Sequence, residues 1–227
     1  MTNPAHPSSP ASPASRALTL PRPAALLCDM DGTLVDTEHA WLDAVAEFLH
    51  AQGSPSSGPT LAPFAGAAVA DAADHLVRQG LTALTAAESA RILDRAFTSR
   101  VAAGVTVQPG ALRLLDRARS LGIPTALVTA SERHVADLVL DTLGRHRFDT
   151  SVTSGETERG KPHPEPYLTA AAALGVDPAD CLAVEDTPTG ATAALAAGCR
   201  LLAVPSVPGI TPGPRTTLVR TLEEIRL

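Results

Sequence analysis

The sequence predicts an α/β protein with a doubly wound parallel sheet and a helical domain inserted after the first strand. From Val105 onward, short apolar runs alternate with helical patterns that begin at proline or stop before glycine. Such alternation with short connections is typical of a parallel sheet with helices on both faces. Residues 36–104 instead show helical patterns without an intervening strand. The first apolar run, at about 24–29, therefore belongs with the second half of the chain.

The expected elements follow from this pattern and from the turn residues between them. In the α/β part we expect strands at 123–128, 148–152, 181–184 and 201–204, and helices at 109–121, 132–143, 164–174 and 188–197. In the insertion we expect helices near 38–51, 67–79 and 86–103, with a loop at Gly53–Pro63.

The predicted domain organisation has three parts. Residues 1–22 are rich in Pro, Ser and Ala and carry little that could form a core, so we expect a disordered tail. Residues 23–35 and 105–227 form the α/β core domain, and residues 36–104 form the helical domain.

Composition excludes several classes of protein. Aromatic residues are 3% of a chain that is 44% hydrophobic, so we expect an aliphatic core. A net charge of −6 without any basic cluster argues against nucleic-acid binding. No apolar run of about 18 residues and no secretory signal are visible. Cys28, Cys181 and Cys199 lack metal-ligand spacing and suit buried thiols. We therefore expect a cytoplasmic protein without nucleic-acid or membrane partners.

Two carboxylates follow the first strand. Asp29 and Asp31 stand two positions apart, and Gly32 comes next. Residues i and i+2 of a strand point the same way, so both acids emerge at the carboxyl end of the strand, where open α/β sheets bind ligands. Because like charges oppose each other's ionisation, folding alone does not explain the pair. A cation or a chemical task would explain it.

Three more candidate sites lie at later strand ends. They are Thr129, Lys161 and the pair Glu185-Asp186. Taken singly, each has a plain alternative: a strand-end threonine, a solvated loop cation, and acids in the first turn of a helix. Together they fall on one edge of one sheet, which favours a shared site.

The residue types in this group suit phosphoryl chemistry. Asp29, Asp31 and Asp186 form an oxygen-rich pocket of the kind that Mg²⁺ prefers. Thr129 and Lys161 suit the oxygens of a phosphate. One carboxylate of the Asp29–Asp31 pair would attack phosphorus, while the other would donate a proton to the leaving oxygen and later remove one from water.

Four segments resemble, in order, the motifs of the haloacid dehalogenase superfamily: Asp29–Glu38, Val128-Thr129, Lys161-Pro162 and Glu185-Asp186. The helical insertion is similar to the α-helical cap of the subgroup with phosphoglycolate phosphatase-like and β-phosphoglucomutase-like members. The resemblance covers about residues 24–205. It implies a Rossmann-like core with residues 36–104 as the cap domain.

The resemblance also implies roles for single residues. Asp29 corresponds to the nucleophile that forms an aspartyl-phosphate, and Asp31 corresponds to the general acid/base. Thr129 and Lys161 correspond to the residues that bind the transferring phosphoryl group. The implied Mg²⁺ ligands are the Asp29 side chain, the Asp31 backbone carbonyl, the Asp186 side chain and, as an additional or water-mediated partner, Glu185.

The resemblance leads us to expect a Mg²⁺-dependent phosphatase acting on a sugar, polyol or glycolate phosphate. The alternative is a β-phosphoglucomutase-like phosphomutase. Such mutases usually carry a histidine where this chain has Trp41, and the loop 64–68 lacks the cationic groups that would hold a second phosphate. A binding module without catalysis is a further alternative. The expected partner is a small phosphorylated metabolite, and the expected assembly is a monomer or a weak homodimer.

Overall fold

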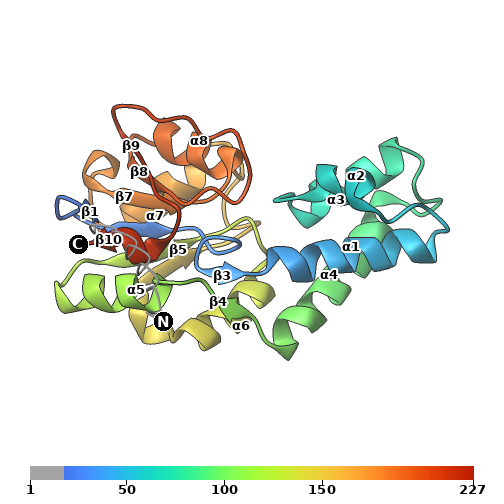
Figure 1. Cartoon of the computed structure of the whole chain (residues 1–227), viewed down its shortest axis with the longest axis horizontal. Coiled ribbons are helices and arrows are strands. Elements are labelled where there is room, and N and C mark those ends of the chain that lie inside the picture. Colours follow the sequence, from blue (N-terminus) through green and yellow to red (C-terminus); the bar gives the residue numbers. More distant parts are fainter. Residues whose placement is uncertain (1–17) are drawn as a thin grey trace, which may run out of the picture.

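The computed structural model describes residues 18–227 and contains the predicted α/β architecture (Figure 1). The part of the expected tail at residues 1–17 lies outside the described residues. The remainder differs from expectation, because β1 (Leu18–Thr19) pairs in parallel with β10 (Ile225–Arg226) near the C-terminus. A two-residue strand has no periodicity to detect, so the sequence did not indicate this pair.

A six-stranded parallel sheet forms the centre of the molecule, in the order β6-β5-β2-β7-β8-β9. Its strands are β2 (Leu26–Cys28), β5 (Thr125–Val128), β6 (Thr150–Val152), β7 (Leu182–Glu185), β8 (Arg200–Ala203) and β9 (Thr216–Leu218). The central strand β2 is buried on both faces. Leu26 and Cys28 belong to one hydrophobic cluster and Leu27 to the other. Strand β9 was not predicted from the sequence.

Helices cover both faces of this sheet. They are α5 (Ala111–Ser120), α6 (Arg133–Leu143), α7 (Glu165–Leu174) and α8 (Pro188–Ala196). The buried residues of α5 and α6 join the cluster of Leu26, whereas those of α7 and α8 join the cluster of Leu27. In Figure 1, α5 and α6 lie in the lower part of the view and α8 lies in the upper part, beside β8 and β9. Three one-turn 3-10 helices complete this part: Arg145–Arg147, Pro178–Asp180 and Leu222–Glu224.

The helical insertion, residues 38–103, extends to one side of the sheet (Figure 1). It contains α1 (Glu38–Ala51), α2 (Gly58–Leu61), a 3-10 helix (Ala62–Phe64), α3 (Val69–Arg78) and α4 (Ala86–Ala103). An antiparallel pair, β3 (Val35–Asp36) and β4 (Thr106–Val107), joins its two ends. The two short helices at 58–64 lie in a region expected to be a loop, where proline fits the first helical turn.

The interior of the insertion is built around its aromatic residues. The Trp41 indole N–H donates to the Phe64 carbonyl at 2.8 Å and meets the Phe97 ring edge-on at a centroid distance of 5.6 Å. Trp41 therefore has a packing role, and it also lines the cavity described below. Among residues 18–227, no helix has the length and hydrophobicity required to cross a lipid bilayer.

Candidate active site

A cavity of about 390 Å³ lies between the carboxyl edge of the sheet and the helical insertion. The sheet side contributes Asp29, Asp31, Lys161 and Asp186 to its lining. Asp29 directly follows β2 and Asp186 directly follows β7, which is a neighbour of β2 in the sheet. Parallel register thus brings together acids that are far apart in the sequence.

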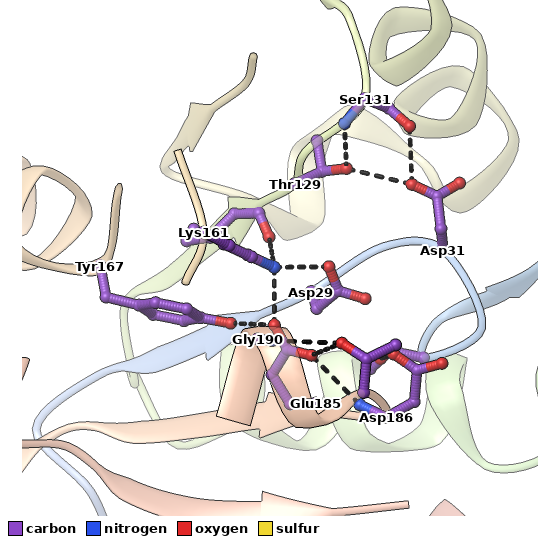
Figure 2. A network of polar contacts seen from close by, with 12 residues as sticks. Asp29, Asp31, Thr129, Ser131, Lys161, Tyr167, Glu185, Asp186 and Gly190 are labelled. Carbon is purple, nitrogen blue, oxygen red and sulfur yellow. Dashed lines mark hydrogen bonds and ion pairs between the residues drawn. The ribbon is translucent and has the colours of Figure 1, made fainter. Parts of the chain in front are cut away.

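Lys161 connects two of these strand ends. Its ammonium donates to Asp29 Oδ1 at 2.6 Å, to Glu185 Oε1 at 2.6 Å and to the Val128 carbonyl at 2.9 Å (Figure 2). The Lys161 side chain is only 5% exposed. Burial lowers the pKa of Lys161, but the Asp29 and Glu185 carboxylates outweigh burial and raise it above its usual value. The lysine therefore stays charged.

Asp29 lies in a strongly anionic environment. Burial and the nearby Glu185 carboxylate raise the pKa of Asp29 well above its usual value, and Lys161 opposes this only in part. The Lys161 ammonium pairs with Asp29 and Glu185, and the Asp186 carboxylate lies beside them, so the group carries a surplus of negative charge. A divalent cation would balance it.

Glu185 is buried completely and held on both oxygens. Its Oε1 accepts from Lys161 and, at 2.6 Å, from the Tyr167 hydroxyl. Its Oε2 accepts from the Asp186 backbone N–H at 3.3 Å and from the Thr187 hydroxyl at 3.4 Å. A Cβ at Gly190 would lie 1.8 Å from Glu185 Oε1, so only glycine leaves room for the carboxylate.

Asp186 accepts from two hydroxyls. Thr33 donates to its Oδ1 at 3.1 Å and Ser206 to its Oδ2 at 2.6 Å. Gly32 approaches the same carboxylate with a φ of +79°, and a Cβ there would lie 2.1 Å from Asp186 Oδ2. Burial and the Glu185 charge raise the pKa of Asp186 to about 7.

Asp31 belongs to a second polar group beside the first. Its Oδ1 accepts from Thr37 at 2.6 Å, and its Oδ2 accepts from Thr129 at 3.1 Å and Ser131 at 2.7 Å. Thr129 and Glu185 lie behind the cavity lining, whereas Ser131 is part of it. The predicted residues therefore form two adjoining groups, one around Lys161 and one around Asp31 (Figure 2).

The acidic group around Lys161 fits a hard divalent cation. Asp29, Glu185 and Asp186 each offer a carboxylate oxygen, and these oxygens lie within 4.8 Å of one another. Asp29 Oδ2 is buried without any hydrogen-bond partner, an arrangement that is costly unless another ligand satisfies it. Oxygen ligands in this number suit Mg²⁺.

Several residues of the site were not singled out from the sequence. Ser206 follows the carboxyl end of β8, so the strand-end rule that found Asp186 could have found it. Tyr167 lies within α7 and carries no such signal, because its hydroxyl meets Glu185 only after helix and sheet pack together.

The family of the chain follows from comparison with known proteins. The haloacid dehalogenase-like hydrolase family matches residues 23–198. The chain belongs to this family. Validoxylamine A 7'-phosphate phosphatase from Streptomyces hygroscopicus subsp. limoneus is 35% identical over 174 residues, 76% of this chain and 81% of the relative. Hexitol phosphatase A from Escherichia coli (strain K12) is 35% identical over 201 residues, 82% and 84% of the two chains.

A solved structure supports the fold of this haloacid dehalogenase-like hydrolase. CbbY from Rhodobacter sphaeroides, determined in complex with phosphate, superposes with a TM-score of 0.78 at 24% identity. The match covers 88% of this chain and 95% of that protein. The expected family and fold class are therefore confirmed.

Proposed function

We propose that this hydrolase is a Mg²⁺-dependent phosphatase of small sugar or polyol phosphates and works through an aspartyl-phosphate on Asp29. The observation that carries the proposal is the buried group of Lys161 with Asp29, Glu185 and Asp186 at the sheet end of the cavity. This group combines a nucleophilic carboxylate with the charges that a transferring phosphoryl group requires.

In the first step, an Asp29 carboxylate oxygen forms a bond to phosphorus as the ester P–O bond breaks. Asp31 donates a proton to the departing oxygen, which leaves as an alcohol. Thr129 and Ser131 donate hydrogen bonds to Asp31, and Thr37 holds its other oxygen, so that the carboxyl group is oriented beside the cavity. Lys161 binds the phosphoryl group and offsets its charge.

In the second step, water attacks the phosphorus of the aspartyl-phosphate and Asp31 removes its proton. The bond between phosphorus and Asp29 then breaks, which releases inorganic phosphate and restores the carboxylate. Asp31 can serve as acid and then as base, because it is a carboxylate after it has donated its proton and is protonated again after it has taken a proton from water.

Asp29, Asp186 and the Asp31 backbone carbonyl would hold Mg²⁺, with Glu185 as a direct or water-mediated partner. When bound, the ion would neutralise charge on the phosphoryl oxygens. Thr33 and Ser206 keep the Asp186 carboxylate in place for this task.

The acidic lining of the cavity favours substrates whose leaving group carries no charge. Lys161 is the one Lys, Arg or His side chain that lines it among the described residues, whereas Glu38, Asp71, Asp94 and Glu132 add four further acids. These acids would repel a carboxylate or a second phosphate but can accept hydrogen bonds from hydroxyls. A polyol or sugar phosphate is therefore favoured over glycolate phosphate, in line with the name of hexitol phosphatase A.

The same observation weighs against the phosphomutase alternative, which needs a grip on a second phosphate. A mutase would exchange sugar phosphate isomers, would need a bisphosphate primer and would release little free phosphate.

We also propose that residues 36–104 act as a cap over a core of residues 23–35 and 105–227, opening for substrate and closing to limit water.

A panel of phosphorylated metabolites tests the proposed function. We expect phosphate release from hexitol or sugar phosphates with Mg²⁺, none after chelation, and a hydroxylamine-sensitive phosphoenzyme. Asp29→Asn should lower turnover by at least about 10³-fold. Asp43→Asn, on the exposed face of α1 away from the cavity, is the matched control and should behave as wild type. Full turnover in Asp29→Asn would exclude the mechanism.

A further inference from the structure

Tyr167 is the single tyrosine of the chain and lies completely buried, outside the cavity lining. Its hydroxyl donates to Glu185 Oε1 at 2.6 Å (Figure 2). Burial and the Glu185 carboxylate raise the pKa of Tyr167 well above its usual value. The hydroxyl therefore remains a hydrogen-bond donor throughout the ordinary pH range.

The hydrogen bond from Tyr167 to Glu185 matters because of the hydrogen bonds that Lys161 makes. An ammonium group has three N–H donors, and Lys161 uses all three within the protein, on Asp29, Glu185 and the Val128 carbonyl. A phosphoryl oxygen can therefore be bound by Lys161 only when one of these three acceptors is replaced.

Glu185 is the acceptor that has a second short donor. If Lys161 left Glu185 Oε1, Tyr167 would still donate to that oxygen at its present position. Without the hydroxyl, the buried carboxylate would keep only the two longer contacts on Oε2, at 3.3 and 3.4 Å. Losing Lys161 would then be costly, because an unpaired buried carboxylate is strongly disfavoured.

We infer that Tyr167 is a positioning residue that holds Glu185 while Lys161 exchanges its Glu185 contact for a phosphoryl oxygen. Tyr167 touches neither the substrate nor the cavity and acts through Glu185. The inference rests on the proposed phosphatase function, because it requires a phosphoryl group bound at Lys161.

The unmodified protein allows a direct test. Labelling with ¹³Cζ-tyrosine gives a single NMR signal, since Tyr167 is the only tyrosine. Addition of orthovanadate with Mg²⁺ should shift this signal, because the Tyr167 hydroxyl becomes the main donor to Glu185. Mg²⁺ alone is the reference. An unchanged signal in protein saturated with vanadate would overturn the inference.

Tyr167→Phe provides a second test, because it removes the hydroxyl and keeps the ring. We expect the affinity for vanadate, measured by calorimetry with Mg²⁺, to fall about tenfold, the effect typical of a lost hydrogen bond to a charged group. Leu168→Ala, at an exposed position of the same helix, is the control and should leave the affinity unchanged. A lower melting temperature with unchanged vanadate affinity would show a merely structural role and would overturn the inference.

The two proposals fail in different ways. A wild-type protein that binds neither phosphate nor vanadate would refute the proposed function and the role of Tyr167 with it. A wild-type protein that binds vanadate, with an unmoved tyrosine signal and an unaffected Tyr167→Phe variant, would refute the role of Tyr167 alone.

Discussion

The sheet side and the helical side of the cavity hold their charged groups in different ways. On the sheet side, Asp29, Lys161 and Glu185 have side chains that are at most 9% exposed, and short hydrogen bonds join them. On the helical side, Asp71 is exposed and Asp94 is 28% exposed, and the small residues of the loop 65–68 line the cavity with them. Buried charges interact strongly, whereas exposed charges are screened by water.

This difference indicates a division of tasks. A buried, fully bonded group is preorganised for one charge distribution, which suits the transferring phosphoryl group. Exposed acids on a separate helical unit can select among leaving groups without altering that chemistry. We therefore expect substitutions on the sheet side to change the rate for every substrate, and substitutions on the helical side to change the preference between substrates.

Removing a charge from each side should show the largest contrast. Lys161→Ala should lower kcat/KM for a small phosphomonoester by about 10²–10³-fold, because the phosphoryl group loses its cationic partner. Asp71→Asn, in the helical insertion, should change it by less than about threefold, as expected of an exposed charge. Steady-state kinetics on one substrate compares the two. Similar losses in both variants would contradict the division of tasks.

Adding one methyl group to a glycine on each side should have an intermediate effect. Gly190→Ala places a Cβ against the Glu185 carboxylate, so we expect a loss of about 1–3 kcal/mol in the free energy of unfolding and a clear fall in turnover. Gly58→Ala, in α2, meets nothing within 4 Å and should alter stability by less than about 1 kcal/mol. Denaturant unfolding measures both. An inert Gly190→Ala would mean that Glu185 can move freely.

The smallest effect should be the pH dependence of stability without divalent cations. The pKa of Asp186 rises from 3.8 to about 7 on folding, so the folded protein binds this proton more tightly than the unfolded chain. The stabilisation is fully present below pH 3.8 and is lost as the pH rises to about 7. We expect the melting temperature to fall by at least about 2 °C between pH 5 and pH 8.

Asp186→Asn is the control for this dependence, since it removes the titrating group and should flatten the slope. Asp29 and Glu38 have pKa values raised by burial, and His39 has a pKa raised by its hydrogen bond to Asp36, so these three groups contribute slopes of the same sign in both proteins. The slope of Asp186→Asn should therefore be smaller than that of the wild type but not zero. Equal slopes in the two proteins would show that Asp186 does not titrate in this range. Mg²⁺ at pH 8 should restore the melting temperature of the wild type.

Much of the fold could be predicted because long elements carry repeated signals. Helices α1 and α4 occupy the expected ranges 38–51 and 86–103. Strands β1, β3, β4, β9 and β10 were not expected, because segments of two or three residues show no periodicity and depend on their pairing partners.

In the candidate site, too, some residue positions could be predicted from the sequence and others could not. Asp29, Lys161 and Asp186 could be grouped in advance, because parallel strands end at one edge of the sheet. That Glu185 and Thr129 would lie behind the cavity could not be foreseen, since strand-end position does not determine side-chain direction.

By itself, the sequence determined the alternation of strands and helices, the inserted helical segment and the acids and lysine at the strand ends. Apolar periodicity and turn residues act locally, so they can be read along the chain. The tertiary structure alone decided that Lys161 uses all its donors, that the Tyr167 hydroxyl donates to Glu185 and that Gly190 leaves room for that carboxylate. These contacts join residues from different strands, loops and helices, and they arise only when those elements pack together.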